Sequence, residues 1–365
     1  MAKTGIDGTR KLQPLFAEAY NSEGWALCIG AGTSGPIFPS WVELSQQLFS
    51  GTTTGIDPVV ADETFNQLAS RYSPDAMLEA CRDRLGISDN KFAELLVDKL
   101  YTPSSKMMSP SDYQIFLECL ASRAPGSMSD PKWKEFKKLT TLYLNKTSAF
   151  RLAGPVYKAC LNDMPPRAIL SFNAEPLFFT LLSHAIWEQL WKLGSKRSKD
   201  ATPKAVFRMV PRSVFANVYG RIPYYFIHGL LPVPVRKRKH TVLSSEDKLV
   251  FTETAYLSLA NSVYSWQAAT FLNTCASHKV LFVGVSLSDS NMRRWLAWVH
   301  FNRLRELQEL GKPVNSSTHH VWINTIKPEL DMRWLEALVA PLGIRILWIQ
   351  DWNELEATVE HLFGL

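Results

Sequence analysis

The chain has 365 residues, of which 46% are hydrophobic and 20% are charged, and its formal net charge is +6. This composition excludes a disordered chain, and the length suggests about two domains or one large domain with an insertion. The sequence shows neither the apolar segment of a signal peptide nor a stretch that is apolar and long enough to span a membrane. We therefore expect a cytoplasmic protein without membrane contact.

The five cysteines are scattered along the sequence, and none of them forms a Cys-x-x-Cys pair. Disulfide frameworks and structural zinc sites both require cysteines in regular, paired spacing. We therefore expect reduced cysteines and no bound metal.

The first predicted element is a buried strand at residues 25–29, which runs directly into Gly-Ala-Gly-Thr-Ser-Gly at residues 30–35. An amphipathic helix follows from Trp41. Glycines allow the backbone to approach a pyrophosphate closely, and the N–H groups of such a loop can point at the anion. An ordinary tight turn uses the same residue types, so this segment alone leaves both interpretations open.

Apolar residues recur at helical spacing from residue 62 to residue 145, with breaks expected at Ser73-Pro74, Gly86, Thr102-Pro103 and Ser109-Pro110. This pattern predicts several amphipathic helices. We place an inserted helical subdomain at residues 61–150 and the main domain at residues 1–60 and 151–365.

Strands resume after the helical block. Short apolar runs predict them at residues 168–172, 224–227, 279–283, 320–324 and 344–349. Buried strands that alternate with helices predict an α/β fold, a doubly wound, Rossmann-like parallel sheet. In such sheets the ligand binds at the carboxyl ends of the strands, near the point where the strand order reverses.

Small or polar residues follow four of these strands. They are Gly30, Ala31, Gly32, Thr33 and Ser34 after the first strand, Asn173 and Glu175 after the second, His228 and Gly229 after the third, and Gly284, Ser286 and Asp289 after the fourth. Four such strand ends together indicate a ligand site more specifically than any one of them.

These segments resemble, in chain order, the motifs of the SIR2-like (sirtuin-fold) proteins. Residues 30–35 with Pro39-Ser40-Trp41 look like the family signature, and residues 171–175 occupy the place of its Thr-x-Asn-x-Asp motif. Residues 226–229 match the motif with the catalytic histidine, and residues 282–291 are similar to a segment of bacterial SIR2-like defence proteins. The resemblance covers roughly residues 24–295.

The resemblance implies an NAD⁺ glycohydrolase that cleaves its substrate NAD to nicotinamide and ADP-ribose, with Asn173 and His228 as catalytic residues. It implies further contacts to NAD from Gly30, Ala31, Gly32, Thr33, Ser34, Glu175, Gly284, Ser286 and Asp289. An amide can bind ribose hydroxyls and a water, and a neutral imidazole can accept a proton at neutral pH.

Each of these residues also has a purely structural interpretation. Asn173 and Asp289 are good helix caps, and His228 suits a core position. Gly284 and Ser286 suit a tight turn between a strand and a helix. The sequence alone leaves these alternatives open.

Two departures from the family pattern bear on the activity. Protein-deacylating sirtuins carry a four-cysteine zinc module, which this sequence lacks, and Glu175 stands where the family usually has aspartate. The missing module and the helical insertion favour the branch that resembles NAD hydrolases of bacterial anti-phage systems. An NAD-dependent protein deacylase and a non-catalytic module that senses NAD or ADP-ribose are the alternatives.

The resemblance also implies a homo-oligomer that acts with a defence partner such as a HerA-like ATPase or a short Argonaute. Two basic tracts, at residues 192–204 and 236–240, are candidates for binding an acidic partner or nucleic acid. A solvated loop is the alternative interpretation of each tract.

Overall fold

The structure is a computed structural model that describes residues 24–122, 131–193, 206–211, 221–235, 249–261, 265–312, 314 and 318–365. The basic tract at residues 236–240 and most of the tract at residues 192–204 lie outside the described residues.

Seven strands of the described residues form one sheet, in the order β3-β4-β2-β1-β5-β6-β7, and every neighbouring pair is parallel. The strands are β1 (Trp25–Ile29), β2 (Ile169–Ser171), β3 (Phe207–Val210), β4 (Ile222–Phe226), β5 (Lys279–Val283), β6 (His320–Thr325) and β7 (Ile344–Ile349). The predicted doubly wound, Rossmann-like sheet is confirmed. The sequence analysis missed the edge strand β3, whose four residues are too few to show a pattern.

Helices account for most of the remaining described residues. They are α2 (Trp41–Thr52), α3 (Pro58–Ala69), α4 (Pro74–Leu85), α5 (Asp89–Met107), α6 (Pro110–Ser122), α7 (Pro131–Leu142), α8 (Ser148–Leu161), α9 (Leu177–Leu193), α10 (Glu253–Asn261), α11 (Trp266–Ser277), α12 (Ser290–Glu309), α13 (Glu329–Val339) and α14 (Leu355–Phe363).

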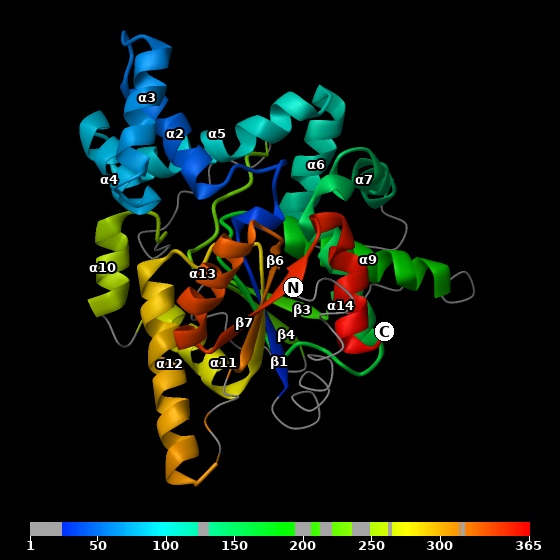
Figure 1. Cartoon of the computed structure of the whole chain (residues 1–365). Coiled ribbons are helices and arrows are strands. Elements are labelled where there is room, and N and C mark those ends of the chain that lie inside the picture. The colour runs from blue at the N-terminus through cyan, green and yellow to red at the C-terminus, as the bar shows by residue number, and fades with distance from the viewer. Residues whose placement is uncertain are drawn as a thin grey trace.

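The side chains of β1 alternate between two hydrophobic cores, as the period of two along a strand requires. Trp25, Leu27 and Ile29 join a core that also contains side chains from α8, α9 and α14. Ala26 and Cys28 join a second core, to which α11, α12 and α13 contribute. Helices therefore cover both faces of the sheet, and β1 is buried along its whole length (Figure 1).

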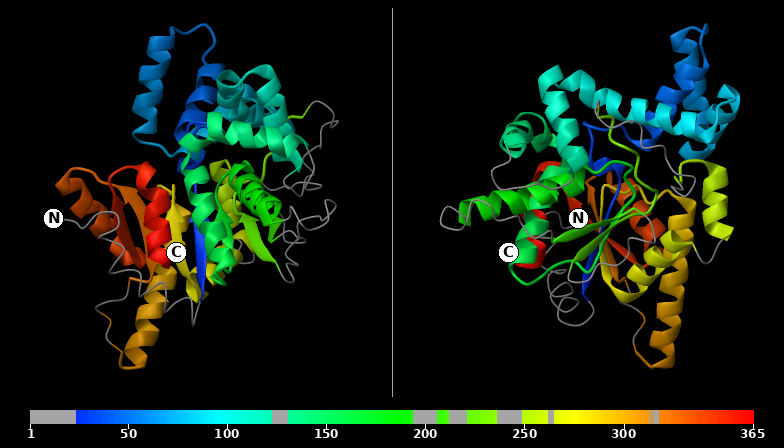
Figure 2. Two further views of the ribbon diagram at one scale, coloured as in Figure 1. Left: turned by 90° about the vertical axis from the view of Figure 1, so that its right-hand side faces the viewer. Right: turned by 180° about the vertical axis from the view of Figure 1, so that it is seen from behind.

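Helices α2 to α7 gather beyond one end of the sheet, which is the end where β1 leads into α2 (Figures 1 and 2). Because all strands are parallel, this is the carboxyl end of every strand. Helices α3 to α7 occupy the residues of the predicted insertion. The boundaries of that subdomain, at residues 61 and 150, stay a prediction.

Local sequence signals explain most helix boundaries in this region. The Ser40 side chain accepts a hydrogen bond from the Glu43 N–H, and the Glu43 carboxylate accepts one from the Ser40 N–H, so that α2 begins with a capping box. Ser73 caps α4, which ends at Gly86 with φ +60°.

The predicted break at Thr102-Pro103 is wrong, because α5 continues through Pro103 to Met107. Proline removes one backbone hydrogen bond of a helix and crowds the preceding turn. Leu100, Tyr101 and Ser104 are buried around this point, and their packing holds the helix together.

Among the described residues, no helix has the length and apolar character needed to cross a membrane. The described residues also contain no group of three or more His, Cys, Asp or Glu side chains that could hold a metal ion.

His184 on α9 is buried between aromatic rings of the inserted helices and of its own helix. Its ring centroid lies 5.9 Å from that of Trp133, 5.3 Å from that of Phe136 and 5.5 Å from that of Trp187. Burial lowers the pKa of His184 to about 4, while Glu188 opposes this shift. The folded protein therefore holds a neutral imidazole at a pH at which the unfolded chain binds a proton.

We expect the free energy of unfolding to fall as the pH drops from 6.5 towards 4, because the unfolded chain binds more protons than the folded one in this range. Each unit by which the pKa of His184 is lowered contributes about 1.4 kcal/mol to this loss. His184→Phe keeps a ring in place and removes the titration. Urea unfolding at pH 7.5 and pH 5 should show a smaller loss for the variant than for the wild type, whereas equal losses would contradict the assignment.

Candidate functional site

The glycine-rich segment after β1 folds into a tight turn that docks on the end of β5. Gly30 N–H donates to the Val283 carbonyl at 3.2 Å, and Gly32 N–H donates to the Gly284 carbonyl at 3.0 Å. Thr33 and Ser34 N–H close the turn by donating to the Gly30 and Ala31 carbonyls, at 3.0 and 3.1 Å. This differs from the expectation that the N–H groups of the loop point at a phosphate, because these four groups are bonded within the protein.

Close packing between two backbone segments explains the glycines themselves. A Cβ atom on Gly32 would lie 2.9 Å from the Gly284 carbonyl oxygen, and one on Gly30 would lie 2.6 Å from the same atom. Gly284 has φ +65°, and its Cβ would lie 2.5 Å from the Thr33 nitrogen. Gly35 differs from these three, because a Cβ there would meet no atom within 4 Å.

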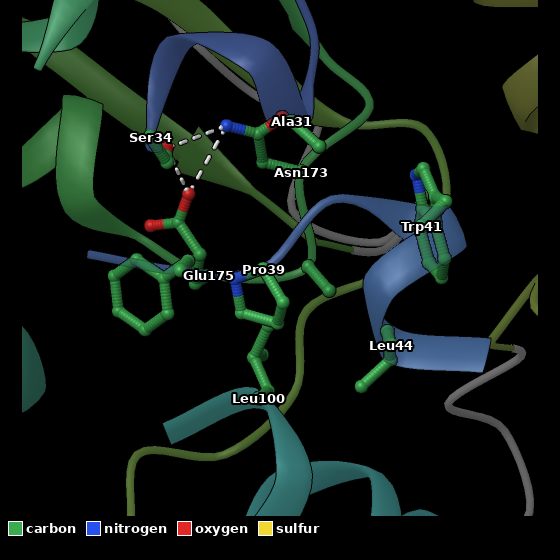
Figure 3. Close-up of a pocket in the computed structure, with 10 residues that line it drawn as sticks. Ala31, Ser34, Pro39, Trp41, Leu44, Leu100, Asn173 and Glu175 are labelled. Atoms are coloured by element: carbon green, nitrogen blue, oxygen red, sulfur yellow. Dashed lines mark hydrogen bonds between the residues drawn. The ribbon is translucent and has the colours of Figure 1, made fainter. Parts of the chain in front are cut away.

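The turn brings Thr33 and Ser34 beside Asn173, which follows the neighbouring strand β2. The Asn173 amide nitrogen donates to Ser34 Oγ at 3.0 Å, to Thr33 Oγ1 at 3.3 Å and to Glu175 Oε1 at 3.0 Å. Ser34 Oγ in turn donates to Glu175 Oε1 at 2.6 Å. Figure 3 shows Ser34, Asn173 and Glu175 as a closed triangle of hydrogen bonds.

Glu175 is a fully buried carboxyl group at the start of α9. Its Oε2 atom accepts a hydrogen bond from the Leu177 N–H. Burial raises the pKa of Glu175, and the hydrogen bonds from Ser34, Leu177 and Asn173 oppose that rise. Glu175, and not Asn173, therefore bonds to the first turn of α9.

The amide oxygen of Asn173 is buried and has no hydrogen-bond partner in the structure. Asn173 lines a pocket together with Ser34, Glu175, Ala31 and Trp41. The volume of this pocket is about 20 Å³, which is room for about one water molecule. A larger hollow of about 440 Å³ adjoins it at Ala31, Phe38 and Pro39. A buried acceptor beside a space of this size can receive a hydrogen bond from a water or from a ligand hydroxyl group.

His228 lies just after β4, in a cage of aromatic rings. The centroid of its ring is 4.7 Å from that of Phe172, 5.3 Å from that of Tyr256 and 5.9 Å from that of Trp41. Burial lowers the pKa of His228 to about 4, although the charge of Asp289 acts in the opposite direction. The imidazole is therefore neutral at pH 7 and able to accept a proton.

Tyr256 and Asp289 complete a second polar group around His228. The Tyr256 hydroxyl lies 2.9 Å from His228 Nε2. Burial raises the pKa of Tyr256, and the charge of Asp289 raises it further. Sequence reasoning missed Tyr256, because it lies within a helix and belongs to no recognisable motif.

The residues after β5 divide between structural and exposed positions. Asp289 Oδ1 accepts a hydrogen bond from the Met292 N–H at 2.8 Å, so Asp289 caps α12. Ser286 is exposed, and its hydroxyl lies 2.7 Å from the Ser288 hydroxyl. The candidate site thus consists of two groups of residues. The first contains Thr33, Ser34, Asn173 and Glu175, and the second contains His228, Tyr256 and Asp289. Trp41 lies between them, because it lines the pocket and also packs against His228.

We expect Gly32→Val to lower the free energy of unfolding by about 1–3 kcal/mol, because the new side chain would be forced against the Gly284 carbonyl. The same displacement would move Thr33 and Ser34 away from Asn173 and weaken NAD binding. Gly35→Ala is the matched control, since its Cβ enters open space and should change stability by less than about 0.5 kcal/mol. Urea unfolding compares the stability of the two variants, and calorimetry with NAD⁺ tests binding by Gly32→Val. Equal stability of the two variants would contradict the packing account.

Comparison with known protein families agrees with the resemblance seen in the motifs. The family model of the SIR2-like domain matches residues 185–337, a range that includes His228, Tyr256 and Asp289. No curated protein matches the chain. The family match, on a seven-stranded parallel sheet, supports the assignment of this chain to the SIR2-like family.

Proposed function

We propose that this protein is an NAD⁺ glycohydrolase, which cleaves NAD⁺ to nicotinamide and ADP-ribose. The observation that carries the proposal is the buried, unpartnered amide oxygen of Asn173 beside a water-sized pocket at the carboxyl end of the sheet. The SIR2-like match at residues 185–337, a range that includes His228, supports an NAD-related function for the chain.

The reaction breaks the bond between nicotinamide and ribose C1′. Nicotinamide leaves as a neutral molecule with the bonding electron pair, positive charge develops on the ribose ring, and a water oxygen then forms the new bond to C1′. In our proposal the Asn173 amide oxygen accepts a hydrogen bond from this water or from a ribose hydroxyl. Its amide nitrogen is already held by Thr33, Ser34 and Glu175, so the orientation of the oxygen is fixed before the substrate binds.

His228 takes up the proton that the water or a ribose hydroxyl loses. Its neutral state at pH 7 allows this role, and the nearby Asp289 carboxylate favours the imidazolium that results. Because four N–H groups of the glycine-rich turn are bonded internally, we place the remainder of the dinucleotide in the larger hollow beside the turn. Ser40, Gln46 and Gln47 offer polar groups there.

A module that binds NAD or ADP-ribose without cleaving it is the second candidate. The low pKa of His228, about 4, favours this alternative, because a base is most effective when its pKa lies near the working pH. NAD-dependent protein deacylation is the third candidate.

As a biological role for the glycohydrolase we propose depletion of NAD in anti-phage defence.

We expect Asn173→Ala and His228→Ala each to lower nicotinamide release by about 10²-fold to 10⁴-fold, because each removes a group that contacts the reacting atoms. Chromatography of nicotinamide measures the rate, and circular dichroism checks that the variants are folded. His361→Ala, on α14 near the C-terminus and outside both motifs, is the control. Wild-type rates in both site variants would refute the assignment, and NAD⁺ binding without cleavage by the wild type would favour the sensing module.

We expect the dilute, isolated chain to be weakly active and to gain activity on assembly, since an unrestrained NAD hydrolase would deplete its host. A displacement of a catalytic group by about 1 Å suffices to lower the rate by about 10²-fold. Nicotinamide release per subunit should therefore rise with protein concentration, or on addition of a partner encoded beside it. A rate per subunit that is high and independent of concentration, in a chain shown to be monomeric by light scattering, would contradict this expectation.

A further inference from the structure

The segment at residues 249–261 surrounds His228 with contacts to both its backbone and its ring. Val250 N–H donates to the His228 carbonyl at 3.0 Å, and the Phe251 ring packs on Trp41 with a centroid distance of 4.9 Å. Tyr256, in the first turn of α10 in the same segment, lies against the His228 ring. The imidazole is thus enclosed by a part of the chain that is not its own strand.

The hydroxyl of Tyr256 lies 2.9 Å from His228 Nε2 and 3.4 Å from His228 Nδ1, so Nε2 is its nearer partner. Burial and the charge of Asp289 raise the pKa of Tyr256, which keeps the phenol protonated. The hydroxyl either donates to Nε2 or accepts from an Nε2–H group. The direction of this one hydrogen bond is therefore tied to the tautomer of the imidazole.

The helix that carries Tyr256 is held at its N-terminus by the inserted helices. Glu79 on α4 accepts hydrogen bonds from the Thr254 N–H, at 2.6 Å, and from the Thr254 hydroxyl. Glu79 is mostly buried and is also paired with Arg82 at 3.0 Å. Figure 1 shows α10 directly beside α4, away from the sheet that carries His228.

We propose that Tyr256 is a positioning residue for His228, and that Glu79 of the inserted helices keeps it in place. The Tyr256 hydroxyl, 2.9 Å from Nε2, fixes the orientation and the tautomer of the imidazole. The carboxylate of Glu79 fixes the first turn of α10, two residues before Tyr256. A continuous set of contacts therefore joins the inserted helices to His228. A partner bound to those helices can change the orientation and the tautomer of the imidazole through these contacts. This inference rests on the role of His228 in the proposed function.

The first test compares Tyr256→Phe with the wild type by nitrogen NMR of protein labelled with ¹⁵N-histidine, at pH 7. The His228 signals are identified by their absence in His228→Gln. We expect a single tautomer of His228 in the wild type and a mixture of tautomers in Tyr256→Phe, which keeps the ring and loses the hydroxyl. The control is Tyr225→Phe, on β4, whose ring contacts Trp266. The same single tautomer in Tyr256→Phe would overturn the proposal.

Kinetics supply a second measurement on the same variants. We expect Tyr256→Phe to lower kcat for nicotinamide release by about 10-fold to 100-fold and to change KM by less than about 2-fold, because the hydroxyl acts on the base and not on NAD⁺ binding. An unchanged kcat would contradict the role. If the wild type does not cleave NAD⁺ at all, the proposed function fails, whereas the NMR result still decides whether Tyr256 sets the tautomer.

The contribution of the inserted helices is tested by Glu79→Ala, with Glu94→Ala on the exposed face of α5 as its control. We expect Glu79→Ala to shift His228 towards the same mixture of tautomers and to lower kcat by roughly 3-fold to 10-fold. Circular dichroism verifies the fold of both variants. A folded Glu79→Ala protein with the wild-type tautomer and the wild-type kcat would show that the inserted helices do not act on His228 through this contact.

Discussion

The close packing of the glycine-rich turn on Gly284 is the contact on which the arrangement of the site depends. It joins the carboxyl ends of β1 and β5, two neighbouring strands at the centre of the sheet. Because Gly32 has no side chain, its N–H reaches the Gly284 carbonyl, and the turn tightens until Thr33 and Ser34 face Asn173. A side chain at Gly32 or Gly284 would separate the ends of β1 and β5 and displace the hydroxyl groups that orient the Asn173 amide.

The two polar side chains of the site, Asn173 and His228, are held in place by different kinds of interaction. Asn173 is fixed by hydrogen bonds through its nitrogen, which leaves its oxygen buried and unpartnered. His228 is fixed by aromatic packing and by Tyr256, and its burial holds it neutral. A buried acceptor and a neutral base suit a reaction in which a water must be oriented and then deprotonated. We regard the inserted helices as part of this arrangement, because α10 connects them to the histidine.

Much of the fold could be predicted from the sequence, since buried strands and amphipathic helices differ in period. The proximity of Ser34 and Asn173 also followed from the rule that parallel strands end at one edge of the sheet. The role of the glycines could not be predicted, because the residue against which they pack, Gly284, lies some 250 residues further along the chain. Tyr256 was missed for the same reason, because its helix α10 is held at its first turn by Glu79, which lies far away along the chain. The helix break predicted at Pro103 was wrong, because the packing of its buried neighbours outweighs the loss of one backbone hydrogen bond.

The measurement that tests the account most directly is a product analysis of the wild-type protein with NAD⁺, at protein concentrations that span its assembly. One set of samples contains NAD⁺ alone, and a second also contains an acyl-lysine peptide. The account predicts equal amounts of nicotinamide and ADP-ribose in both sets, with no effect of the peptide. Cleavage that requires the peptide, or NAD⁺ that binds and stays intact at every concentration, would contradict it.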